Sequence, residues 1–228
     1  MRKIFLAYLL TVLITSFVYA EDDKDEAYPD ISIGITAVAG SFNITEKNVG
    51  IDKEPGFITG AGLSIEKLVY NHIGIGTGIQ YRYFYLDFTD KENTETVDAR
   101  WTFQSINIPF LIILSAGGDE SSINFSGGFV YSNIFYSEMT ADSDADVDIK
   151  KDNAIKYTNT DQIGLTAGIY FRIKATDFTD FILGVTGEYY PTNLLYERED
   201  SGDRLNMFSY NLTVGYMFRT GFFPGSSD

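Results

Sequence analysis

The fold class is decided by one stretch of sequence, Ile73-Gly74-Ile75-Gly76-Thr77-Gly78-Ile79-Gln80-Tyr81-Arg82-Tyr83. Apart from the threonine, its odd positions carry large apolar side chains, while its even positions carry glycine, glutamine or arginine. Successive side chains of a β-strand point to opposite faces. This period of two therefore predicts a strand with one apolar face and one small or polar face.

The same alternation recurs along the chain. It predicts seven further strands, at residues 31–40, 57–66, 101–114, 123–132, 162–172, 180–189 and 209–218. The longest apolar run beyond residue 100, at residues 108–114, is too short for a transmembrane helix. Pro109 cannot donate to a strand ladder, so a β-bulge is expected there.

Connections between these segments alternate in length, which predicts the architecture. Short links fall near residues 69–71, 115–121 and 174–179, and long acidic ones near 42–55, 87–100, 134–159 and 192–204. An all-β, eight-stranded antiparallel transmembrane β-barrel with short periplasmic turns and long extracellular loops has this pattern. A soluble β-sandwich or lipocalin is the alternative, but the glycine- and serine-rich face would make a poor soluble core.

The N-terminus predicts export. Residues 1–20 combine Arg2 and Lys3, an apolar run and a small-residue end, as a secretory signal peptide cleaved after Ala20 does. Residues 21–29 form an acidic periplasmic lead-in, residues 30–218 the barrel, and residues 219–228 a periplasmic tail. Localisation in the cell outer membrane follows, with outer-membrane lipid as one partner.

Composition narrows the function. The net charge of −15 becomes −17 without Arg2 and Lys3, which argues against nucleic acid as a partner. The chain has no cysteine, which excludes disulfides and thiolate metal sites. No cofactor or metal is expected, and the barrel is predicted to be a monomer.

Two segments carry a resemblance to a family. Residues 71–81, a glycine-rich strand, are followed by Ser105-Ile106-Asn107-Ile108-Pro109-Phe110-Leu111. This combination resembles the PorT and OmpX-like outer-membrane β-barrel superfamily over roughly residues 30–218. The resemblance implies a barrel of the Gram-negative outer membrane, without implying a particular ligand.

The last predicted strand is similar to the C-terminal signal that the barrel-assembly machinery binds. Tyr216 and Phe218 provide its aromatic residues. Thr213 replaces the commoner glycine, and ten residues follow Phe218. The assembly machinery is therefore the second expected partner.

Four ionisable side chains fall on the predicted lumen face: Glu66, Arg82, Arg172 and Glu188. An eight-stranded barrel is just wide enough for interior side chains to fill it, so these charges are expected to form an ion-pair network. A gated or narrow polar conduit is the alternative.

Catalytic patterns are scarce, so no enzyme is predicted. His72, the single histidine, falls at a predicted turn, which leaves no Ser-His-acid triad or histidine-rich metal site to assemble. Glu66 and Glu188 could act as an acid–base pair, but two arginines on the same face favour salt bridges.

The third long loop carries Asp142, Asp144, Asp146 and Asp148 at alternate positions. The glycine and the final glutamate of a calcium loop are missing, so a solvated acidic loop is favoured over a weak calcium site.

These observations predict a non-enzymatic surface barrel whose loops contact an unknown extracellular ligand, because loops on rigid scaffolds commonly carry recognition. The alternative is a narrow channel for small or apolar solutes, indicated by apolar Leu111, Ile113 and Ile182 on otherwise polar faces. A purely structural role in the envelope is the third possibility.

Overall fold

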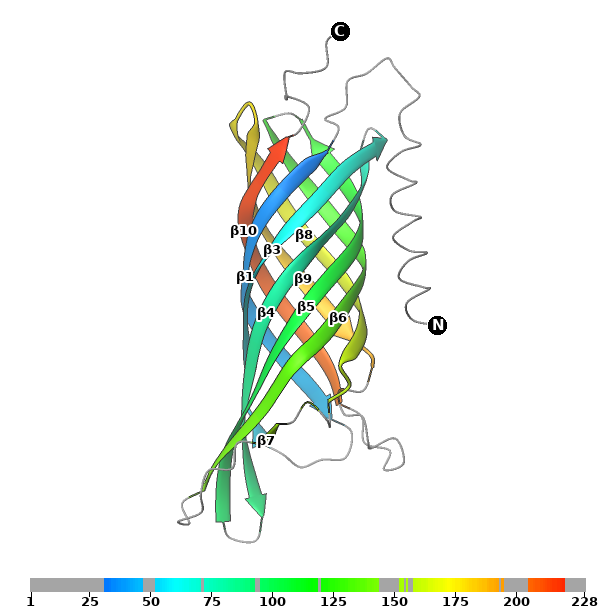
Figure 1. Cartoon of the computed structure of the whole chain (residues 1–228). Coiled ribbons are helices and arrows are strands. Elements are labelled where there is room, and N and C mark those ends of the chain that lie inside the picture. The colour runs from blue at the N-terminus through cyan, green and yellow to red at the C-terminus, as the bar shows by residue number, and fades with distance from the viewer. Residues whose placement is uncertain are drawn as a thin grey trace.

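The computed structural model describes residues 31–46, 52–70, 72–92, 95–118, 120–143, 152–153, 155, 158–192, 194 and 205–219. Eight long strands form a closed antiparallel barrel, and each contains one of the predicted segments (Figure 1). They are β1 (Ser32–Glu46), β3 (Gly56–Tyr70), β4 (Ile73–Glu92), β5 (Glu95–Gly117), β6 (Ser121–Ser143), β8 (Asp161–Thr176), β9 (Thr179–Tyr190) and β10 (Leu205–Arg219). β2 (Asp52–Lys53) and β7 (Asp152–Asn153) are two-residue strands.

Pairing of the first strand with the last closes the sheet. β1 and β10 pair from Ser32 opposite Arg219 to Glu46 opposite Leu205. A path that starts at Ser32 and steps from each residue to its partner on the next strand passes once around the barrel and returns to β1 at Phe42. The closed sheet is therefore staggered by ten residues. Such a stagger tilts the strands by roughly 35–45° to the barrel axis. It also gives a narrow interior that side chains can fill.

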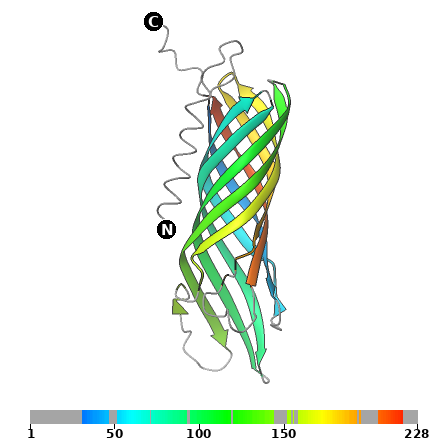
Figure 2. The same ribbon diagram turned by 90° about the vertical axis from the view of Figure 1, so that its right-hand side faces the viewer.

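The two ends of the barrel differ. At the turn end, where β1 begins and β10 ends, consecutive strands are joined by tight connections, one of which contains Gly117 with φ +133°. At the loop end, β4, β5 and β6 run on beyond the other strands (Figures 1 and 2). β2 and β7 pair with β4 and β6 respectively.

The extension of β4–β6 corrects two predicted loops. Residues 87–92 pair with residues 95–100, from Asp87 opposite Arg100 to Glu92 opposite Glu95, and residues 134–143 continue β6. Hydrogen bonding between strands does not require the apolar alternation that lipid imposes, so polar residues extend these strands without that signal.

The bulge predicted at Pro109 is also wrong. Pairing of β4 with β5 skips the positions opposite Ile108 and Pro109, but resumes in the same register. The Thr77 hydroxyl donates a hydrogen bond to the Pro109 carbonyl at 2.8 Å. The register shift of β5 against β6 occurs instead at Gln104/Ser105.

Large apolar side chains cover the outer wall. Among the residues that the structure describes, thirty-two large apolar side chains are exposed, including Ile35, Phe129 and Val185. Small and polar side chains such as Ser32, Thr36 and Thr166 are buried on the inner face. This arrangement is the reverse of a soluble β-protein and suits a wall in contact with hydrocarbon.

A charged side chain on this wall should destabilise the barrel according to its depth. We expect Val185→Arg, at the middle of β9, to cost about 2–4 kcal/mol of unfolding free energy, because arginine must enter the midplane. The matched variant Thr45→Arg, near the loop end of β1, should cost about 0–1 kcal/mol. Urea unfolding in lipid vesicles measures both. Equal losses would contradict the assignment of the apolar wall to lipid.

Candidate functional site

The interior of the barrel is the candidate site, and its loop end is apolar. Twelve buried side chains form a cluster, which we call the apolar plug: Phe42, Ile44, Ile58, Phe84, Leu86, Trp101, Phe103, Val130, Ile134, Tyr190, Leu194 and Met207. Its aromatic rings pack in a chain, with centroids 5.8 Å apart for Phe42 and Phe84, 5.7 Å for Phe84 and Phe103, and 4.5 Å for Phe103 and Trp101. This packing makes the loop end a dry region.

Polar contacts hold the rim of the plug. The Trp101 indole donates to the Ser137 hydroxyl at 2.8 Å, and the Thr158 hydroxyl donates to the same oxygen at 3.1 Å. The backbone N–H of Asn159 donates to the carbonyl of Leu194 at 2.7 Å. Described residues of the third and fourth long connections are thus hydrogen-bonded to each other at the mouth.

Next to the plug lies the first ion pair, in a set of residues that we call the loop-end network. Arg82 donates to both carboxylate oxygens of Glu188, with 2.6 Å between Nη2 and Oε1. Both side chains are almost fully buried, at 5% and 4% exposure. Arg82 also donates to Gln80, and Tyr190 donates to Glu188 at 2.9 Å. Asn107 donates to the Tyr190 hydroxyl at 3.0 Å.

A second group of charges closes the turn end and forms the turn-end network. Arg172 and Tyr170 both donate to Glu66 Oε2, at 2.7 and 2.9 Å. Asp180 is fully buried and accepts two hydrogen bonds from Arg219, at 2.7 and 3.0 Å. Arg172 Nε lies 3.8 Å from Asp180 Oδ2, which links the two pairs.

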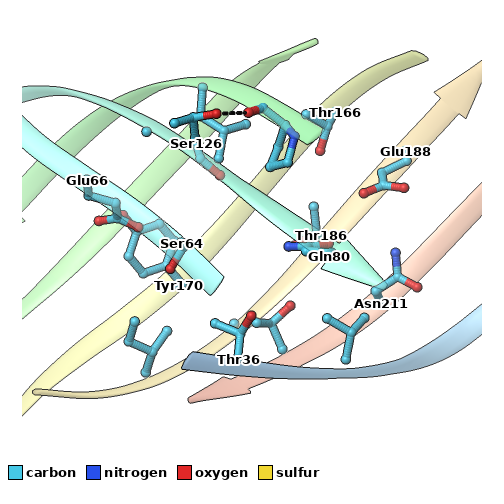
Figure 3. A pocket seen from close by; sticks show the side chains of 18 of the residues that line it. Thr36, Ser64, Glu66, Gln80, Ser126, Thr166, Tyr170, Thr186, Glu188 and Asn211 are labelled. Atoms are coloured by element: carbon cyan, nitrogen blue, oxygen red, sulfur yellow. Dashed lines mark hydrogen bonds between the residues drawn. The ribbon is translucent and has the colours of Figure 1, made fainter. Parts of the chain in front are cut away.

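Between the two networks is a cavity of about 100 Å³, which we call the chamber. Figure 3 shows Glu66 and Tyr170 at one side of it and Glu188, Gln80 and Asn211 at the other. Five threonines also line it: Thr36, Thr77, Thr166, Thr186 and Thr213. The interior therefore has four levels: apolar plug, loop-end network, chamber and turn-end network.

The structure brings the four predicted lumen residues together as two separate pairs, Arg82 with Glu188 and Arg172 with Glu66. Sequence reasoning missed Asp180 and Arg219. Asp180 falls on the polar face of its predicted strand, but its pairing partner was assigned to the tail. β10 instead includes Arg219, one residue beyond the predicted end of the barrel.

The apolar patch proposed for solute passage is in the interior. Ile113 and Ile182 are buried, and Leu111 and Ile182 line the chamber. Ile113 lies beside Glu66 and Arg172 of the turn-end network, and the loop-end network separates all three side chains from the apolar plug.

The remaining predicted residues lie elsewhere. Tyr216 and Phe218 are exposed on the outer face of β10, and the ring of Tyr216 contacts Phe181 edge-on at 5.6 Å. His72 is exposed in the turn between β3 and β4. Asp142 pairs with Asp98 in the β5–β6 ladder, whereas Asp144, Asp146 and Asp148 lie outside the described residues.

Among the residues that the structure describes, no group of three or more histidine, cysteine, aspartate or glutamate side chains could hold a metal ion. The described part of the chain also contains no helix of the length and hydrophobicity needed to cross a membrane.

Comparison with solved structures identifies the class. The outer membrane protein OprG from Pseudomonas aeruginosa superposes with a TM-score of 0.54 and 12% identity, over 82% of this chain and 94% of that chain. A major outer membrane protein from Thermus thermophilus gives a TM-score of 0.45 and 12% identity, over 82% and 98% of the two chains. Neisserial surface protein A gives 0.40 and 12%, over 85% and 99%.

The closed sheet with its apolar wall is thus an eight-stranded β-barrel of the outer-membrane class. At these identities the likeness shows the fold alone. No protein-family model matches the chain, and no curated protein matches its sequence.

Proposed function

We propose that this chain is a non-enzymatic outer-membrane barrel, exported by a signal peptide cleaved after Ala20, that contacts an extracellular ligand through its loop end. The observation that carries the proposal is the filled interior. The apolar plug and two ion-pair networks occupy successive levels of the lumen. Because these side chains pack and pair across the lumen, the projecting loop end is the part left for recognition.

The loop end is suited to recognition because it is built on paired strands. β4, β5 and β6 carry their hydrogen bonding beyond the rest of the barrel, and short strands pair at both sides of this extension. A surface held by strand ladders loses little conformational entropy on binding. The resemblance to PorT and OmpX-like barrels fits this role and remains part of the proposal.

A deletion in the third long connection tests the role of the loop end. Removing residues 144–151 draws residues 140–143 of β6 away from β5, because Asp152 lies opposite Met139, but it spares the Trp101–Ser137 contact. We expect binding of whole cells to collagen-coated or lipopolysaccharide-coated wells to fall severalfold, with solute uptake unchanged. Replacing the same residues by a glycine–serine linker of equal length separates the loss of side chains from the loss of length.

The opposite result supports a different function. Reduced uptake with normal cell binding would favour a narrow channel for small solutes, for which the chamber is the supporting observation. Unchanged binding and uptake in both variants would contradict recognition through this connection and favour a structural role in the envelope.

A further inference from the structure

Two buried polar atoms belong to residues that line the chamber and are unsatisfied. Asn211 Oδ1 and Arg82 Nε are buried and have no hydrogen-bond partner within the protein. Both residues line the chamber. Burying a polar atom without a partner is unfavourable, so such atoms in natural proteins are commonly satisfied by internal water.

The charges around the chamber favour a neutral ligand. Arg82 is matched by Glu188, and Glu66 is matched by Arg172. An entering ion would bring an additional charge into a lumen whose charges already pair. A neutral polar molecule can use the free donor and the free acceptor without that penalty.

The size of the chamber fits a few water molecules. Its volume of about 100 Å³ is well above the roughly 10–15 Å³ that one buried water requires on the same measure. Hydroxyl groups of Thr36, Ser64 and Thr186 in the wall offer the two to four partners that a buried water requires.

We propose that the chamber is a binding site for an ordered cluster of water molecules that connects Arg82 Nε with Asn211 Oδ1. The apolar plug separates this cluster from the loop end, and the turn-end network covers it from the other side. Its exchange with bulk water is therefore slow. The inference concerns the lumen and goes beyond the proposed recognition by the loop end, so either can fail without the other.

Water-to-protein cross-relaxation by NMR tests the site in the full-length mature barrel in lipid nanodiscs. We expect the Arg82 Nε–H proton to show a water cross-peak whose sign is opposite in laboratory-frame and rotating-frame experiments, as long-lived bound water requires. The Trp101 indole N–H is the internal control, because it is buried within the apolar plug and bonded to Ser137. It should show no such peak. Absence of the peak at Arg82 would overturn the proposal.

A stability measurement gives a second, independent result. Asn211→Leu should lower the urea midpoint, because leucine displaces the water cluster and leaves Arg82 Nε unpaired. In a dry chamber the same change would raise the midpoint by removing an unpaired amide oxygen. Ser209→Ala is the control, since Ser209 accepts from Asn211 Nδ2 at 3.3 Å but does not line the chamber. A midpoint for Asn211→Leu at or above that of the wild type overturns the proposal.

Discussion

Replacing Arg82 by methionine should destabilise the barrel by about 3–5 kcal/mol, because Glu188 would remain buried without its partner. The pair is well formed for such an effect, with two hydrogen bonds between side chains that are at most 5% exposed. Urea unfolding followed by the emission of Trp101, the one tryptophan of the chain, measures the loss.

Two further variants separate the buried charge from the lost packing. The double variant Arg82→Met with Glu188→Leu removes both charges and should recover most of the stability, since an apolar replacement of a buried pair is often neutral or stabilising. Asp87→Ala breaks the exposed pair with Arg100, whose side chains are 43% and 56% exposed, and should cost at most about 1 kcal/mol. A double variant as unstable as Arg82→Met would contradict a penalty that arises from unpaired charge.

The apolar plug should be the barrier to permeation, so the second large effect is expected there. Purified wild-type protein in planar bilayers should show no steady current. The double variant Phe84→Ala with Phe103→Ala removes two rings that pack at a tilt with their centroids 5.7 Å apart, and it should produce measurable conductance. The reason is that the rest of the lumen, from the loop-end network through the chamber to the turn-end network, carries polar and charged side chains. These side chains can solvate an ion that has passed the plug.

Controls must separate an opened plug from a damaged barrel. Each Phe→Ala change in a core costs about 3–5 kcal/mol, so folding of the double variant is verified by its heat-dependent migration in detergent gels. Phe84→Leu with Phe103→Leu keeps apolar bulk in the plug and should remain silent. A folded alanine variant that carries no current would place the barrier in the ion-pair networks, and steady wild-type currents would contradict the filled lumen.

The strands that cross the membrane were predictable because lipid imposes a single rule on them. Hydrocarbon outside and a narrow polar lumen inside force large apolar residues to alternate with small or polar ones, as residues 73–83 do. Polar segments outside the lipid are free of this rule. Residues 87–92 and 95–100 therefore looked like part of a loop, although they pair with each other throughout.

The apolar plug was missed although the sequence carries a signal for it. On β1, the even positions are small or polar as far as Thr36, and then become apolar at Phe42 and Ile44. The odd positions change in the opposite sense, from Ile35 to Asn43. This inversion of the period-two pattern marks the place where the outer face leaves lipid and the inner face becomes an ordinary dry core.

The lumen charges were only partly predictable. Strand alternation placed Glu66, Arg82, Arg172 and Glu188 on one face, but the pairing depends on the stagger of the whole sheet. Arg82 and Glu188 are 106 residues apart in the chain, and so are Glu66 and Arg172. Alternation within a strand does not encode height along the barrel axis, so it could not distinguish two separate levels from one network.

The pairing of β1 with β10 also has a consequence for the assembly of the barrel. Ser32 and Arg219 are neighbours in the finished sheet but stand at opposite limits of the described chain. Until the final strand arrives, β1 and β9 each present a row of unmatched N–H and C=O groups that hydrocarbon cannot solvate. We therefore expect the sheet to be stable in lipid only once β1 and β10 have paired.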